Sequence, residues 1–234
     1  MQTIPLSNLL YMALPLLIIS YFYYRWTDNK TEIATATLRM SVQLIAIGYV
    51  LTSLFETNSL WLLSLLVSIM VIAASLIARR HIQNKDLKTY LILLFAIGVG
   101  GSVNLLLILY FVLDLDNIFE PRMVIPLSGM LFANAMNAIS LAAERFSKER
   151  LKHSYEEARA IAFKASMIPQ INSFLAVGFV SLPGMMTGQI LSGIDPMVAV
   201  RYQIVVMAMV LGSGGISNII YLLSLKNQQP ILSP

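Results

Sequence analysis

Long apolar stretches separated by short polar loops constrain this chain more than any other feature. Seven of them lie at roughly 5–24, 35–55, 58–78, 89–113, 123–142, 167–191 and 197–225. Each is close to the ~20 residues that an α-helix needs to cross a bilayer. Only 12% of the residues are charged, whereas soluble domains contain about a quarter. The sequence therefore predicts an all-α polytopic membrane protein.

The basic residues predict its orientation. Of the 16 Lys and Arg residues, all but Arg122 and Arg201 lie in or beside the loops after the first, third, fifth and seventh stretches. Loops rich in Lys and Arg stay on the cytoplasmic side. We therefore expect about seven transmembrane helices, with the N-terminus outside and the C-terminus in the cytoplasm. The first stretch follows no basic residue and precedes no small-residue cleavage motif, so we expect a retained span.

One long cytoplasmic segment, ERFSKERLKHSYEEARAIAFKA (144–165), contains neither Gly nor Pro. We expect it to form one amphipathic helix, because nothing in it disfavours helical backbone. One helical face is defined by residues that recur at helical spacing, namely Leu151, Tyr155, Ala158, Ala162 and Ala165. This face belongs either to a solvated connector or to a binding surface for a cytoplasmic partner. The pattern predicts a buried face without saying what covers it.

Several chemistries are disfavoured by residue types that the chain lacks. It has no Cys, so it can form neither a thiolate metal site nor a Cys nucleophile. It has no GxxxxGK[ST] loop to hold ATP phosphates. No Asp, Glu, Lys or His lies deep in an apolar stretch, which disfavours proton- or sodium-coupled transport. We expect no catalytic site, no nucleic-acid partner and no cofactor bound by this chain. The glycine-rich run LGSGGIS (211–217) is expected to allow close helix packing.

The sixth apolar stretch contains a helix break. Pro183 and Gly184 interrupt the segment NSFLAVGFVSLPGMMTGQILSG (172–193). Proline removes a backbone donor and clashes with the preceding turn. Within lipid, such a break is tolerated only where neighbouring helices or a cavity satisfy the freed backbone groups. Because transport pathways are often built from broken helices, the break favours a conduit.

Polar and soft side chains near the break are candidates for lining a pathway. Asn134 and Asn137 share one helical face, and either hold helices together or contact a solute. Met185 and Met186 follow the break; thioethers suit soft metal ions but also fill gaps between helices. The candidate pathway residues are Asn134, Asn137, Ser181, Met185, Met186 and Gln189.

Three segments resemble one known family. RMSVQLIAIGYVL (39–51), IPLSGMLFANAMNAISLAAERF (125–146) and VGFVSLPGMMTGQILSGIDPMVAVRYQI (177–204) are similar to the permease subunits of FetB-type ABC transporters. That family is implicated in bacterial iron export and is related to plant aluminium-tolerance permeases. The resemblance spans residues 39 to about 224. Residues 156–169 keep the Glu–Ala start and the Ile–Pro end of the family's coupling element, but lack its glycine.

The resemblance implies a single permease domain over residues 1–234, in the plasma (inner) membrane. It implies a homodimer that works with a separate ATPase subunit, on which ATP-Mg would bind. Iron or a related metal would be exported through a site between the two protomers. The residues implied in ATPase coupling are Leu151, Tyr155, Glu156, Glu157, Ala158, Arg159 and Ala162. A permease for a nucleotide sugar or a peptide, a passive channel and a membrane anchor remain alternatives.

Overall fold

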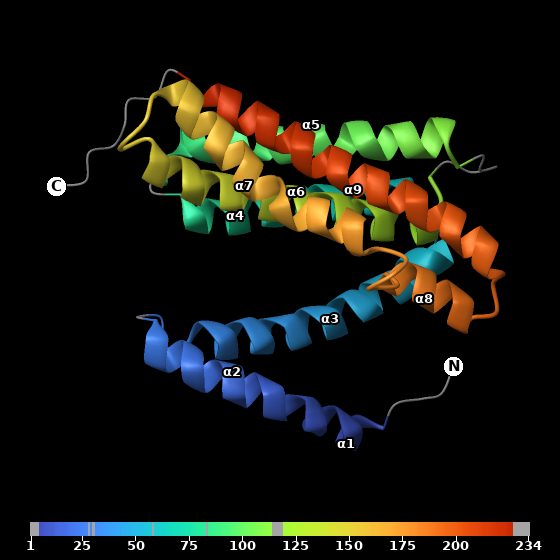
Figure 1. Cartoon of the computed structure of the whole chain (residues 1–234). Helices are drawn as coiled ribbons and strands as arrows, with labels where there is room; N and C mark the ends of the chain where they lie inside the picture. Colours follow the sequence, from blue (N-terminus) through green and yellow to red (C-terminus); the bar gives the residue numbers. More distant parts are fainter. Residues whose placement is uncertain are drawn as a thin grey trace. The chain divides into compact units, whose positions relative to one another are not determined.

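The computed structural model describes residues 5–27, 29, 31–57, 59–82, 84–113 and 119–226. The predicted all-α class is confirmed, since the elements of the described residues are helices (Figure 1). They are α1 (Leu6–Leu9), the 3₁₀ turn η1 (Leu10–Met12), α2 (Ala13–Trp26), α3 (Glu32–Thr57), α4 (Leu60–Ala78), the 3₁₀ turn η2 (Arg79–His81), α5 (Leu87–Phe111), α6 (Pro121–Glu149), α7 (Tyr155–Ala176), α8 (Gly184–Leu191) and α9 (Pro196–Ser224).

The contacts divide the chain into two units, residues 1–57 and residues 58–234. In the first unit, α2 and α3 form a hairpin whose junction is held by the Tyr23 hydroxyl, which donates to the Glu32 carboxylate over 2.6 Å. Nearly all described side chains of this unit are exposed or half-buried, with Leu54 as the buried one. The expectation of one permease domain over residues 1–234 stays a prediction.

The second unit is a helical bundle built around α6 and α9. Helix α9 contacts α5, α6, α7 and α8, and α6 contacts α4, α5 and α7. Figure 1 shows α9 running along the bundle from α8 to the end where α6 and α7 are joined. Buried side chains from α5, α6 and α9 fill the centre, among them Leu93, Ile97, Phe132, Ile139 and Leu222.

Glycines let these helices approach closely. A Cβ atom added at Gly100 of α5 would lie 2.9 Å from the backbone nitrogen of Ser217 on α9. Within the run 211–217, a Cβ atom at Gly212 would overlap the amide oxygen of Asn104. The predicted packing role of this run is therefore confirmed. In lipid, such contacts between small residues supply much of the attraction between helices.

Six helices of the described residues are long and apolar enough to cross a membrane. They are Ser7–Trp26, Glu32–Thr57, Leu60–Ala78, Leu87–Phe111, Pro121–Glu149 and Pro196–Ser224, and they match six of the seven predicted stretches. Helix α7 is not among them, since charged and amide side chains such as Lys164 and Gln170 interrupt its apolar residues. A seventh crossing and the orientation of the chain stay predictions.

The predicted single helix over 144–165 is wrong. Helix α6 ends at Glu149, and α7 begins at Tyr155 after a turn. The reason is a capping box: the Ser154 hydroxyl accepts from the backbone N–H of Glu157, and the Glu157 carboxylate accepts from the backbone N–H of Ser154. This reciprocal pair satisfies two donors at a helix start, so the chain begins a new helix there.

The predicted stretch 167–191 is not one continuous helix either. Helix α7 ends at Ala176 and α8 begins at Gly184, with Pro183 as its N-cap residue. The expected break at Pro183 and Gly184 is therefore present, but it is wider than predicted. Gly178 has φ of 91°, a left-handed conformation that glycine adopts without strain.

The Gly100 contact predicts a strong effect of one methyl group. Gly100→Ala should lower the free energy of unfolding by about 1–3 kcal/mol, because its Cβ meets backbone atoms that cannot move cheaply. Gly98→Ala is the matched control on the same helix, since its Cβ would lie 3.6 Å from Val71. That variant should be neutral or stabilising by up to ~1 kcal/mol. Thermal unfolding of the purified protein in detergent measures both; equal melting temperatures would contradict the packing interpretation.

Candidate functional site

A partly polar cavity lies where α6, α7 and α9 meet. It has a volume of about 250 Å³. We call it the amide cavity, because three of its side chains are amides. Its lining residues are Asn134, Asn137, Leu141, Pro169, Gln170, Ser173, Phe174, Met207 and Val210. Both predicted asparagines line it, together with residues of α7, the helix that begins within the expected cytoplasmic segment 144–165.

Asn134 is fixed by hydrogen bonds to two neighbouring helices. Its Nδ2 donates to the backbone carbonyl of Val210 on α9, and its Oδ1 accepts from Nε2 of Gln170 on α7 over 3.3 Å. Gly214 makes room for this arrangement, because a Cβ atom there would lie 2.6 Å from Nδ2 of Asn134. Asn134 therefore links helices and lines the cavity at once, whereas Asn137 is exposed toward the cavity side of α6.

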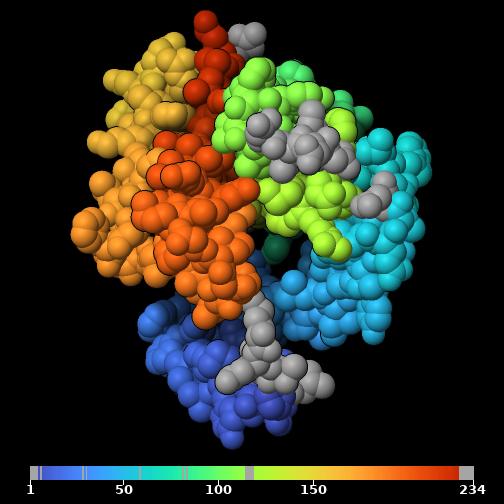
Figure 2. Space-filling view, turned by 90° about the vertical axis from the view of Figure 1, so that its right-hand side faces the viewer, coloured from blue at the N-terminus to red at the C-terminus, as the bar shows by residue number. Residues whose placement is uncertain are grey.

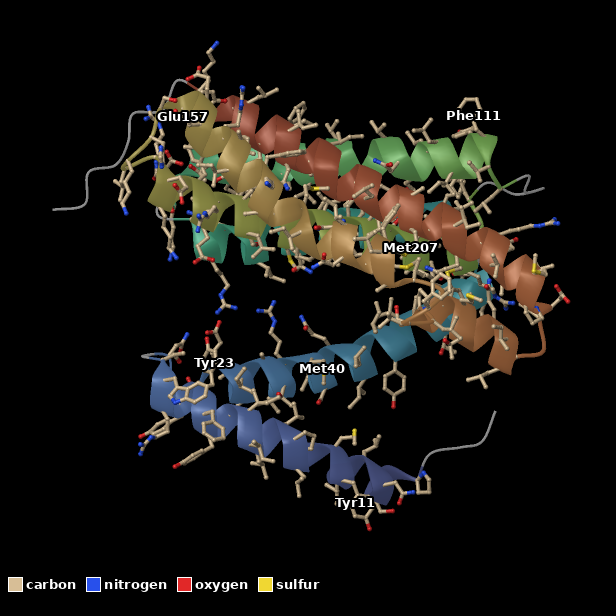
Figure 3. The ribbon with its side chains drawn as sticks, in the orientation of Figure 1. Tyr11, Tyr23, Met40, Phe111, Glu157 and Met207 are labelled. Carbon is tan, nitrogen blue, oxygen red and sulfur yellow. The ribbon has the colours of Figure 1, made fainter. Side chains whose placement is uncertain are left out.

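A second, more apolar cavity adjoins the first. It has a volume of about 420 Å³ and shares Phe174 and Met207 with the amide cavity. We call it the thioether cavity, since Met186 of α8 and Met207 of α9 both line it. Gln203 also lines it, and its buried Oε1 has no hydrogen-bond partner among the described residues. Figure 3 marks Met207 on α9 and Glu157 at the far end of α7.

The helix break lines the thioether cavity at one end of the bundle. Val177 and Gly178 of the break line it together with Leu182, and Pro183 starts the short helix that carries Met186. Figure 2 views the bundle from this end, where the orange surface of α8 and α9 lies beside the green surface of α5 and α6. The break thus positions a soft side chain against α9.

The predicted pathway residues are only partly brought together. Asn134 and Asn137 line the amide cavity and Met186 lines the thioether cavity, while Ser181, Met185 and Gln189 line neither. Sequence reasoning missed Gln170, Ser173, Gln203 and Met207. The two asparagines were identified as amide side chains within otherwise apolar stretches. Gln170 and Gln203 carry the same signal and could have been found in the same way.

The polar donors of both cavities are amide, hydroxyl and thioether groups. In the described part of the chain, no group of three or more His, Asp or Glu side chains is placed to hold a metal ion. Amide and hydroxyl oxygens bind hard cations and their water shells, whereas thioethers favour soft ions. The two cavities could therefore contact a cation in passage more readily than hold one permanently.

The predicted coupling residues divide into a buried and an exposed set. Tyr155, Ala158 and Ala162 are buried within the unit, and the Tyr155 hydroxyl donates to the Leu222 carbonyl on α9 over 2.7 Å. Apart from Leu151, the helical face that sequence analysis left unassigned therefore packs against this chain's own helices. The exposed or half-buried set is Leu151, Glu156, Glu157 and Arg159.

Charged groups surround the turn between α6 and α7. His153 lies 3.4 Å from the Glu149 carboxylate and 3.7 Å from the Glu157 carboxylate, so it bridges the two helices when protonated. The backbone N–H and hydroxyl of Ser154, followed by the charge of His153, hold the pKa of the Glu157 carboxyl below its usual value. Arg159 lies over the ring of Tyr155 at 5.3 Å. The turn is thus a charged, ordered surface.

Comparisons with known proteins find the same family as the sequence motifs. The model of the uncharacterised protein family UPF0014 matches residues 7–229. The probable iron export permease protein FetB of Escherichia coli is 33% identical over 207 residues, which cover 82% of this chain and 78% of the relative. Protein ALUMINUM SENSITIVE 3 of Arabidopsis thaliana is 31% identical over 228 residues, which cover 89% and 81%.

A UPF0014 membrane protein of Synechocystis is 32% identical over 197 residues, covering 77% of this chain and 76% of the relative. No solved structure matches the chain. The predicted resemblance is confirmed. Six apolar helices and these relatives identify a multi-pass membrane protein, and a bacterial inner membrane fits the permease relative.

Replacing Asn134 and replacing Asn137 should change the free energy of unfolding by different amounts. Asn134→Ala should lower the free energy of unfolding by about 1 kcal/mol, because it removes hydrogen bonds to two helices. Asn137→Ala should leave unfolding unchanged, since its side chain is exposed. Unfolding in mixed detergent micelles checks both variants. Equal losses would mean that Asn137 also holds helices together.

Proposed function

The chain belongs to the UPF0014 family, and on that premise we propose that it is the permease subunit of an ABC transporter. It moves its cargo through the amide and thioether cavities and takes energy from a separate ATPase subunit. The cargo is iron or a related metal ion, which leaves the cytoplasm. The observation that carries this proposal is the amide cavity, because polar side chains from α6 and α7 meet a backbone carbonyl of α9 there, inside a membrane-embedded bundle.

The chemistry of the cavities supports passage of an ion. A transported ion must bind well enough to enter and weakly enough to leave. Neutral amide oxygens at Asn134, Asn137 and Gln170 meet this requirement better than a full carboxylate cage would. In the adjoining cavity, the thioether sulfurs of Met186 and Met207 offer a second, softer set of ligands. The name of the bacterial relative, an iron export permease, supports iron as the first cargo to test.

The turn between α6 and α7 is the proposed docking site for the ATPase. Its exposed residues include Leu151, Glu156 and Glu157, whereas Tyr155 fixes the start of α7 to α9. A partner that pushes on this turn would therefore move α7 and, with it, Gln170 in the amide cavity. A homodimer with two ATPase subunits is the assembly that we propose. The bacterial relative that is named as a permease supports a transport role and not an enzymatic one.

Transport in vesicles tests the proposal. Inside-out vesicles that contain this chain and its ATPase should accumulate iron when ATP is added, and a Walker-motif mutant of the ATPase should abolish accumulation. Loss of ATP dependence with continued flux would favour a passive channel. An intact complex that hydrolyses ATP without moving iron would remove iron as the cargo.

One substitution in the amide cavity should separate transport from folding. Asn137→Leu should lower the transport rate by at least roughly tenfold, because it replaces a polar lining group with an apolar one of similar size. Ala133→Leu is the matched control, since Ala133 is exposed on α6 and lines neither cavity. The initial rate of ATP-dependent uptake measures both. Full activity of Asn137→Leu in a folded complex would contradict the proposed path.

A second pair of variants tests the docking turn. Leu151→Asp should reduce copurification of the ATPase, because it places a charge on the exposed turn without disturbing the core. Leu87→Asp is the control, since Leu87 is also exposed, at the start of α5. The amount of ATPase retained on the tagged permease is the measurement. Equal retention in the two variants would place docking elsewhere.

A further inference from the structure

We call the contact between α7 and α9 the seam. Beyond the amide cavity, a buried polar contact joins the two helices along this seam. Nδ2 of Asn218 on α9 donates to the Ser166 hydroxyl on α7 over 2.8 Å. The Ser166 hydroxyl in turn donates to the Phe163 carbonyl over 2.9 Å. Both side chains are fully buried, and neither lines the two cavities. The seam is therefore closed at this point.

The closed contact lies one helical turn from the amide cavity. Ser166 precedes Gln170 by four residues on α7, and Asn218 follows Gly214 by four residues on α9. Four residues correspond to roughly 6 Å along a helix. Gly214 itself touches the Asn134 amide. The Ser166–Asn218 contact is therefore the next polar position toward the turn between α6 and α7.

Three amide side chains on the seam each have a buried oxygen that accepts no hydrogen bond from the described residues. The buried oxygens Oε1 of Gln203, Oε1 of Gln170 and Oδ1 of Asn218 have no hydrogen-bond partner among the described residues. Buried polar atoms are normally satisfied by protein or by ordered water. All three are acceptors, so they suit the hydrogens of water molecules or a cation. An anionic solute such as a nucleotide sugar would need donors instead.

The cavity volumes also favour a hydrated cation. A cation with six water molecules needs roughly 180 Å³, at about 30 Å³ for each water. This volume fits the amide cavity of about 250 Å³ and the thioether cavity of about 420 Å³. A hydrated cation could thus occupy either cavity without a large rearrangement.

We propose that the seam is the route of a small hydrated cation within a single chain, and that the Ser166–Asn218 contact closes this route toward the α6–α7 turn. The inference rests on the proposed transport function and places the closing contact inside one protomer, between α7 and α9. Opening the contact frees the amide of Asn218 to bind the water shell of the cation. The unpartnered oxygens of Gln170 and Gln203 continue the path toward α8.

Cysteine labelling tests this closure without ATPase or iron. The chain has no Cys of its own, so Ser173→Cys places one thiol in the lining of the amide cavity. In sealed vesicles of known sidedness, a membrane-impermeant maleimide should react from the α8 side and only slowly from the side of the α6–α7 turn. Adding Asn218→Ala or Ser166→Ala should raise the slow rate by roughly fivefold or more, as expected for one lost buried hydrogen bond.

Ser213→Ala is the matched control. Its hydroxyl is also fully buried and donates to the Leu131 carbonyl on α6 over 2.8 Å, away from the seam. It should leave labelling unchanged from both sides. Unchanged rates in both seam variants, equal acceleration by Ser213→Ala, or a thiol that reacts equally fast from both sides at the outset would each overturn the proposal. Because the assay needs no transport, failed iron uptake with the expected labelling would count against the proposed function alone.

Discussion

The close approach of α9 to its neighbours is the constraint on which the second unit depends. Helices in lipid gain little from hydrophobic burial, so contact between small residues and buried hydrogen bonds must hold them together. Gly100 and Gly214 remove side chains where α5 and α6 meet α9, and the space is filled by Ser217 and by the Asn134 amide. The same close contacts bring amides of α6 and α7 together beside a backbone carbonyl of α9. Packing and the candidate site thus have a common origin.

Much of the fold could be predicted from the lengths of the apolar stretches, because a bilayer leaves few alternatives to helices of about 20 residues. The boundaries of α6, α7 and α8 could not. Their positions depend on the capping pair of Ser154 and Glu157 and on the conformation of Gly178, which are local hydrogen-bonding and backbone effects. The sequence SYEE contains the capping signature, but the absence of Gly and Pro nearby favoured an uninterrupted helix.

The candidate site was predictable only where a polar residue stood out against apolar neighbours. Asn134 and Asn137 did so, and both line the amide cavity. Ser181 and Gln189 also stood out, yet they lie outside both cavities. Periodicity could not distinguish them, because the side of a helix that faces a cavity depends on tertiary contacts. The alternatives of helix contact and pathway lining proved compatible at Asn134, which does both.

The continuous helix α7, from Tyr155 to Ala176, can act as a lever. Gln170 lies fifteen residues from Tyr155, or roughly 22 Å along the helix axis. A tilt of about 5° at the capped end would therefore displace Gln170 by roughly 2 Å. The Gln170–Asn134 hydrogen bond is already 3.3 Å long, so a displacement of this size would break it. The geometry of one turn at the edge of the bundle thereby sets the hydrogen bonding of an amide buried deep within it.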